Sequence, residues 1–189
     1  MTGCGPAGSL HIVPLGNRRL PPTGPLVREV RPDAAWWWLD DDGNLRVALR
    51  ETRASLLGKP YGGEFYASLQ LAEPPAGSAR TYRVGRETMR HRERLGFVQL
   101  RSASFAGLVT VSRPDARRLY VRLRLEARQQ AYWVFTGWGS DSNVLWAGEF
   151  TAFPGRESGE AVWSRTEEGK LARDANNPVP SEPTPTARP

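Results

Sequence analysis

Apolar and polar residues alternate with a period of two along several stretches of the chain. The cleanest example is residues 118–128, whose apolar positions are Leu119, Val121, Leu123, Leu125 and Ala127. Residues 44–50 and 64–71 follow the same rule. A helix would scatter such positions around its circumference, whereas a half-buried strand places them on one face. The pattern therefore predicts β-strands, with Leu123 in the core and Arg124 on the surface.

Turn-forming segments separate these runs. The segment DDDGN, residues 40–44, predicts a hairpin between the strands that flank it. Weaker strands fit residues 79–84, 95–101 and 105–111, and the basic residues 86–94 are expected to form a loop or one turn. Short strands at regular spacing indicate an all-β fold, a single antiparallel β-sandwich or barrel of about eight or nine short strands.

The pattern divides the chain into three parts. Residues 1–26 are rich in Gly and Pro and are expected to form an extended N-terminal tether. The antiparallel β domain is expected at 27–153. Residues 154–189 are polar and Pro-rich and are expected to form a disordered tail, with Trp163 the one residue suited to docking back. Removing residues 160–189 is therefore expected to leave the melting temperature nearly unchanged.

Composition excludes several classes of function. The chain has 189 residues, of which 39% are hydrophobic, enough for a substantial core. One Cys rules out an intrachain disulfide, and with two His it leaves little material for a zinc site. No stretch approaches the roughly 18 apolar residues of a membrane helix. We expect no metal and no cofactor.

The first residues resemble the end of a bacterial lipoprotein signal peptide. Thr2, Gly3 and Cys4 match the last three positions of the lipobox, in which the Cys becomes the lipidated first residue. Met1 stands where Leu is usual, and the charged and apolar regions of a signal peptide are missing. The resemblance implies lipidation of Cys4 and a place in the cell envelope, provided that the full precursor is made. As written, the chain lacks an export signal and would stay in the cytoplasm. Gly5 replaces the Asp that retains such proteins in the inner membrane, which favours the outer membrane in a diderm host.

Positive charge is concentrated in one region. The net charge is +6, and residues 80–128 carry thirteen Arg against four acidic residues. On the polar side of the strand at 118–128, the candidate polyanion-binding residues are Tyr120, Arg122, Arg124 and Arg128. Arg and aromatic side chains on a sheet are typical of single-stranded nucleic-acid binders. An exported protein would instead meet anionic glycans or lipid headgroups, which makes nucleic acid an unlikely partner there. The alternative is a solvated face paired with Asp and Glu from other strands.

Tryptophan offers a second candidate surface. Trp36, Trp37 and Trp38 are consecutive, so in a strand the middle ring faces opposite to its neighbours. We expect them to pack in the core or at an edge rather than to bind sugars. Trp138 lies in a Gly-Trp-Gly turn and is the better candidate for stacking on a ligand.

Catalytic motifs are missing from the sequence. His91-Arg92-Glu93 resembles the HxE of zinc deaminases only superficially, because the Pro-Cys-x-x-Cys partner is absent. No catalytic residue is therefore assigned. The sequence favours a non-enzymatic cell-envelope lipoprotein acting as a binding or structural module. The alternatives are a barrel that binds single-stranded nucleic acid or another polyanion, and a hydrolase with a carboxylate site.

Overall fold

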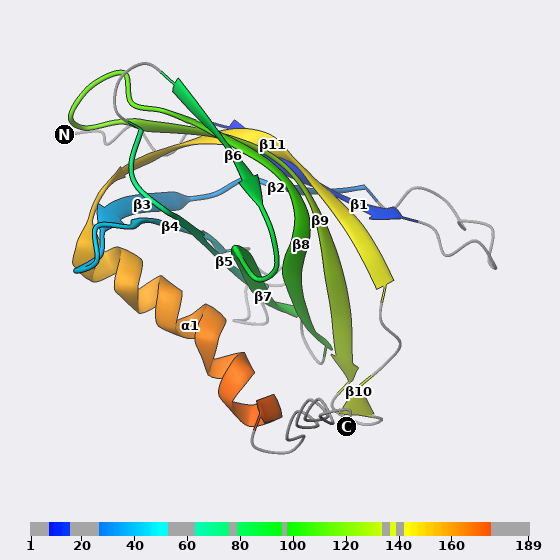
Figure 1. Ribbon diagram of the computed structural model, residues 1–189. Helices are drawn as coiled ribbons and strands as arrows, with labels where there is room; N and C mark the ends of the chain where they lie inside the picture. Colours follow the sequence, from blue (N-terminus) through cyan, green and yellow to red (C-terminus); the bar gives the residue numbers. More distant parts are fainter. Residues whose placement is uncertain are drawn as a thin grey trace, which may run out of the picture.

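The computed structural model describes residues 8–15, 27–52, 63–75, 79–95, 98–133, 137–138 and 142–174. These residues form eleven strands and one helix (Figure 1). The elements are β1 (Gly8–Leu15), β2 (Arg28–Val30), β3 (Ala34–Leu39), β4 (Leu45–Thr52), β5 (Glu64–Leu71), β6 (Ala79–Val84), β7 (Met89–Leu95), β8 (Val98–Ser112), β9 (Leu119–Trp133), β10 (Gly137–Trp138), β11 (Ser142–Pro154) and α1 (Arg156–Asp174).

Seven of the strands close into a barrel. The ring runs β9-β8-β7-β5-β4-β3-β11 and returns to β9. Its pairings are antiparallel except at the closure, where the end of β11 runs parallel to β3 and Phe153 lies opposite Trp36. Strands β1 and β2 extend the sheet from β11, β6 pairs with β8, and β10 pairs with β9. The predicted all-β fold is confirmed, and it is a barrel rather than a sandwich.

The barrel interior is the main hydrophobic core. The predicted inward positions of β4, β5 and β9 are buried there, as the period-two pattern required. Leu123 is buried, and its neighbour Arg124 is exposed. The predicted hairpin joins β3 to β4, and Asp40 Oδ1 accepts the backbone N–H of Asn44 at 2.8 Å. Gly43 takes the left-handed conformation (φ 79°) that this turn requires.

The three consecutive tryptophans divide between two cores. Trp37 points into the barrel, whereas Trp38 points outward into a second apolar cluster. Trp36 is partly buried and packs against that same outer cluster. The expected packing role of the three rings is therefore what the structure shows.

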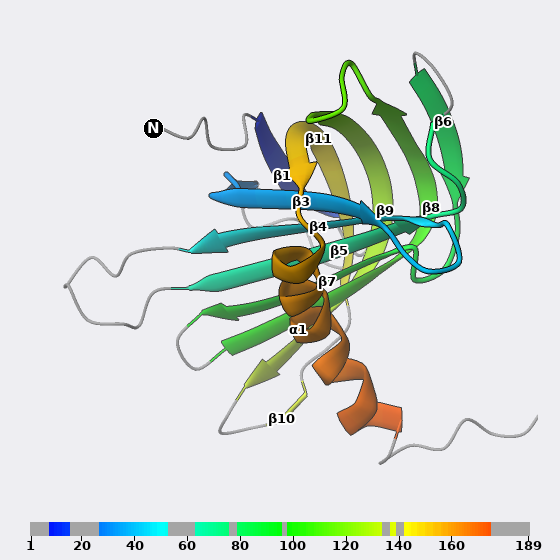
Figure 2. The same ribbon diagram turned by 90° about the vertical axis from the view of Figure 1, so that its left-hand side faces the viewer.

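Helix α1 covers the outer cluster. It lies against the outside of β3, β4, β5 and β7 (Figure 2). Val162 and Trp163 are buried there, and the Trp163 ring meets the Trp38 ring edge-on, with centroids 5.9 Å apart. The expectation of a disordered tail is wrong for residues 156–174, and residues 175–189 lie outside the described part. The expectation that removing residues 160–189 leaves the melting temperature unchanged loses its basis, because Val162 and Trp163 are buried in the outer cluster.

Two further sequence expectations need correction. Residues 8–15, expected within the N-terminal tether, form β1, which lies between β11 and β2 and buries Leu10 and Ile12. Residues 1–7 and 16–26 lie outside the described part. The basic segment expected as a loop forms β7 over Met89–Leu95. Residues 98–101 of one predicted run and the whole run at 105–111 join in one strand, β8, which carries a bulge between Ser104 and Ala106. Leu95 ends β7, and residues 96–97 lie outside the described part.

Candidate functional site

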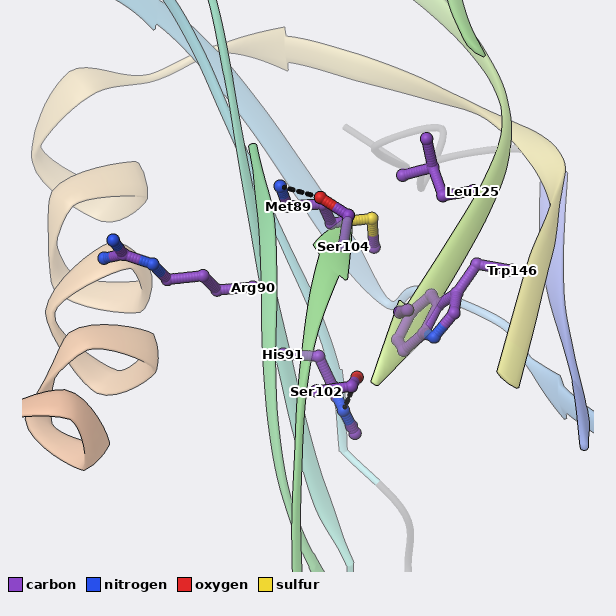
Figure 3. A pocket seen from close by; sticks show the side chains of 8 residues that line it. Met89, Arg90, His91, Ser102, Ser104, Leu125 and Trp146 are labelled. Carbon is purple, nitrogen blue, oxygen red and sulfur yellow. Dashed lines mark hydrogen bonds between the residues drawn. The ribbon is translucent and has the colours of Figure 1, made fainter. Parts of the chain in front are cut away.

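Four polar side chains meet inside the barrel, and together they are called the interior polar cluster. They are Arg28 of β2, His91 and Glu93 of β7, and Ser102 of β8. His91 lies directly opposite Ser102 in the β7–β8 pairing, so both side chains enter the barrel from neighbouring strands. Figure 3 shows this pair beside Trp146 of β11.

The cluster is a connected series of polar contacts. Ser102 Oγ and His91 Nδ1 are hydrogen-bonded at 2.9 Å, and His91 Nε2 lies 3.6 Å from Glu93 Oε2. The same carboxylate oxygen forms an ion pair with Arg28 Nη1. His91 is 3% exposed and Glu93 is 1% exposed. The buried carboxylate therefore has its counter-charge inside the protein, as a buried ion requires.

Aromatic rings enclose the cluster. The His91 ring centroid lies 4.7 Å from that of Phe65 and 5.0 Å from that of Trp146. The guanidinium carbon of Arg28 lies 5.5 Å from the Phe65 centroid, within the range of a cation–π contact. The wall of the site is thus apolar and π-rich, and the charges of Arg28 and Glu93 lie within it.

Burial decides the charge of His91. Removal from water, followed by the positive charge of Arg28, holds the pKa of His91 well below its usual range. The imidazole is therefore neutral near pH 7. If its proton is on Nε2, facing Glu93, then the Ser102 hydroxyl donates to Nδ1. Glu93 then depends on Arg28 alone for a full opposite charge within the cluster.

The cluster contains the residue types of a serine–histidine–carboxylate triad, so it bears on the hydrolase alternative. A triad serine must be open to a substrate carbonyl. Ser102 is buried, and the small pocket beside it is lined by other interior side chains, among them Met89, Leu125 and Trp146. A substrate could reach the hydroxyl only by displacing barrel residues. The hydrolase alternative gains no support from this arrangement.

A second buried carboxylate lies in the same row of the barrel. Glu51 of β4 and Glu93 of β7 are the register partners of Phe65 on its two sides. Glu51 Oε1 accepts the backbone N–H of Arg31 at 2.9 Å, while Glu93 pairs with Arg28. Both carboxylates therefore hold the β2 segment in place, which explains their burial without a catalytic role.

Some buried nitrogen atoms in and beside the cluster lack hydrogen bonds within the described part of the chain. His91 Nε2 and Trp146 Nε1 are among them. Buried donors usually have partners, and an exception points to a bound water, an ion or a ligand group. The polar end of the barrel interior therefore contains buried polar atoms whose hydrogen bonds the described residues do not complete.

The predicted polyanion-binding residues lie together on the outside of the barrel. Tyr120, Arg122, Arg124 and Arg128 are exposed on the outer face of β9, and these four residues are called the arginine face. Arg122 lies opposite Glu149 of β11, but neither Arg122 nor Arg124 forms an ion pair with a described acidic residue. Leu108 of β8, opposite Arg124, is 50% exposed. Whether polyanions bind there stays a prediction.

The other sequence-predicted sites are not resolved by the structure. Cys4 and the side chain of Trp138 lie outside the described residues, although the backbone of Trp138 belongs to β10 and pairs with Tyr132. Among the described residues, no three His, Cys, Asp or Glu side chains gather in a way that could hold a metal ion. The single described helix is not apolar enough to cross a membrane.

Comparison with known proteins gives no relative from which a function could be transferred. No protein-family model, no curated protein and no solved structure matches the chain.

Sequence reasoning found the arginine face and missed the interior polar cluster. The missed signal is that β7 is polar on both faces. Arg90, Arg92 and Arg94 point outward, and the inward positions include His91 and Glu93. A strand that lines a polar end of a barrel carries no apolar stripe there, so a hydropathy pattern cannot separate it from a basic loop.

Proposed function

We propose that this protein is a non-enzymatic, lipid-anchored envelope protein whose barrel docks on anionic lipid headgroups through the arginine face. The observation that carries the proposal is the outward exposure of Arg122 and Arg124 on one strand, without ion pairs to described acids. Cations that form no ion pair with a described acid are available to lipid phosphates, and each one near an anionic bilayer contributes about 1 kcal/mol.

The side chains around these cations suit a membrane interface. Tyr120 is 46% exposed on the same strand, β9. The exposed Leu108 of the neighbouring strand β8 lies beside Arg124. Tyr combines an apolar ring with a polar tip, and Arg can bury its stem while its head stays in water. Such a mixture favours a bilayer surface over a purely aqueous polyanion.

The position of the N-terminal strand supports the same partner. Ser9 of β1 pairs with Glu149 of β11, which pairs with Arg122 of β9, so two strand spacings separate Ser9 from the arginine face. This is about 10 Å at about 4.8 Å per strand. Cys4 precedes Gly8 by four residues, which span at most about 14 Å when extended. A lipid on Cys4 would therefore hold the arginine face close to the bilayer.

Single-stranded nucleic acid is the less favoured partner of this face. Binders of that class stack successive bases on aromatic side chains. The arginine face has one aromatic residue, Tyr120, among its four members. This composition allows charge attraction to nucleic acid but offers no stacking platform.

Vesicle binding tests the proposal. The full chain should sediment with vesicles of phosphatidylglycerol and phosphatidylcholine, should not sediment with pure phosphatidylcholine, and should be released as salt rises. Changing Arg122, Arg124 and Arg128 together to Gln should weaken the partition coefficient by on the order of 100-fold, from about 1 kcal/mol per Arg. The matched control changes Arg50, Arg156 and Arg165 to Gln, on the side of the barrel that carries α1, and should lose much less.

Two outcomes would contradict the proposal. Equal losses in the two triple variants would show that net charge, not the arginine face, governs binding. Tighter binding of a single-stranded oligonucleotide than of anionic vesicles at the same salt would favour the nucleic-acid alternative. The anchor has its own test: with a lipoprotein signal sequence placed upstream and expression in a bacterial host, the product should partition into detergent, and Cys4→Ala should release it.

A further inference from the structure

We propose that the polar end of the barrel interior is a binding site for a guanidinium ligand, and that Arg28 of the chain itself occupies this site. The inference is independent of the arginine face, since it concerns the inside of the barrel. It rests on the contacts of one side chain that enters from β2 and on the groups that receive it.

The receiving groups provide one negative charge and an aromatic wall. Glu93, 1% exposed, offers the carboxylate that pairs with Arg28, and the Phe65 ring faces the guanidinium carbon at 5.5 Å. Phe65 and Trp146 continue the wall, with their centroids 5.7 Å apart. Neutral His91 adds no competing positive charge. A buried carboxylate among aromatic rings is a receptor for an organic cation.

The chemistry selects guanidinium among cations. A guanidinium group is planar and weakly hydrated, so it loses less on leaving water than a compact ammonium, and it can stack on rings while pairing with a carboxylate. It also carries several N–H donors, of which Arg28 Nη1 pairs with Glu93 Oε2. A free metal cation would have one carboxylate and no further described acid within the cluster.

The element that delivers Arg28 is short. Strand β2 has three residues, lies at the end of the sheet, and pairs with β1. The Arg28 side chain is 19% exposed, so it reaches the buried carboxylate from the rim of the barrel. An outside guanidinium group can therefore replace the Arg28 side chain at this rim, while the backbone of β2 and the seven-strand ring stay in place.

Chemical rescue tests this assignment. Arg28→Ala should lose thermal stability, and millimolar ethylguanidinium should restore several degrees of it in a saturable manner. Neutral ethylurea, which has the same shape, should restore none, and ethylammonium should restore less. The double variant Arg28→Ala, Glu93→Gln should not respond, because the carboxylate is gone. Arg31→Ala, at an exposed arginine of the same segment, should lose little stability and show no rescue.

The test remains decisive if Arg28→Ala does not fold. Recovery of the far-UV circular dichroism spectrum on adding ethylguanidinium would then support the site, and no recovery would overturn it. Rescue by ethylurea, or an equal response in the double variant, would also overturn it. The wild-type chain should bind the ligand more weakly than Arg28→Ala, because Arg28 competes for the site. If ethylguanidinium did not bind to the wild-type chain at all, even at 100-fold higher concentration, the proposal that an outside guanidinium group can replace Arg28 would be overturned.

Discussion

Trp163 anchors helix α1 to the barrel, and replacing it with Ala should destabilise the whole domain. The side chain is 8% exposed and belongs to the outer cluster with Trp38, Ala48 and Val162. The guanidinium of Arg46 lies over its ring at 4.6 Å. Truncation to Ala removes all these contacts and leaves a cavity between the helix and the sheet.

The expected loss follows from the buried area. A Trp side chain buries about 150–250 Å², which at about 25 cal/mol per Å² amounts to about 4–6 kcal/mol as an upper bound. Measured truncations of buried Phe and Trp cost about 3–5 kcal/mol, and we expect Trp163→Ala to fall in this range. For a chain of this size, the melting temperature should fall by on the order of 10 °C.

Urea unfolding followed by far-UV circular dichroism measures this loss in the full chain. Ser164→Ala is the matched control, because the exposed Ser164 hydroxyl donates only to the Glu160 carbonyl within the helix. It should change the free energy of unfolding by less than about 0.5 kcal/mol. If Trp163→Ala behaved like Ser164→Ala, helix α1 would not be docked on the barrel, and the tail would be dispensable as its composition suggests.

Two further predictions concern the barrel itself. Leu123→Ala should cost about 2–5 kcal/mol, whereas Arg124→Ala should cost less than about 0.5 kcal/mol; similar urea midpoints for the two variants would contradict the inward and outward assignment of β9. The pKa of His91 is lowered in the folded state. Below about pH 6.5, His91 is therefore protonated in the unfolded chain and stays neutral in the folded chain. Stability should fall as the pH drops through this window, by at most about 1.4 kcal/mol per pH unit from this group, and His91→Asn should flatten that fall. Parallel stability curves between pH 7 and 5 would show that His91 is not a buried neutral group.

The sequence predicts those strands whose two faces differ in chemistry. In β4, β5 and β9 most inward positions are apolar, Glu51 being an exception, and most outward ones are polar, so the alternation identifies both the strand and its buried face. Strand β1 has two clearly buried apolar positions, Leu10 and Ile12, within a segment rich in Gly and Pro. Its pairing with β11 supplies the rest of its stability, and nothing within residues 1–26 indicates that partner.

Helix α1 did leave a signal that mean hydropathy hides. Gly159, Val162, Trp163 and Thr166 have the spacing of one helical face, and all four are buried against the barrel. Two of them are small or polar. A Cβ at Gly159 would lie 2.3 Å from Trp38, so the helix backbone approaches the sheet closely at this glycine. Close approach stabilises the contact without adding apolar residues to the sequence.

The two candidate sites differ in how far the sequence could predict them. The arginine face is local, because its four residues alternate along one strand and strand periodicity alone places them together. The interior polar cluster is assembled from β2, β7 and β8, and its ion pair joins residues 28 and 93. Such a pair becomes visible only once the order of the strands around the barrel is known.

The barrel can close only when strand β11 is in place. It is the last strand of the described chain, and it pairs with β1, the first strand, with β9 and, at its end, with β3. Contacts of such long sequence separation form slowly, and β1 and β3 must wait unpaired on that side until residues 142–154 have left the ribosome. A nascent or shortened chain would expose three unpaired strand edges, which invites aggregation. The barrel should therefore close only after residues 142–154 have been synthesised, and a delay before that point should favour chaperone capture.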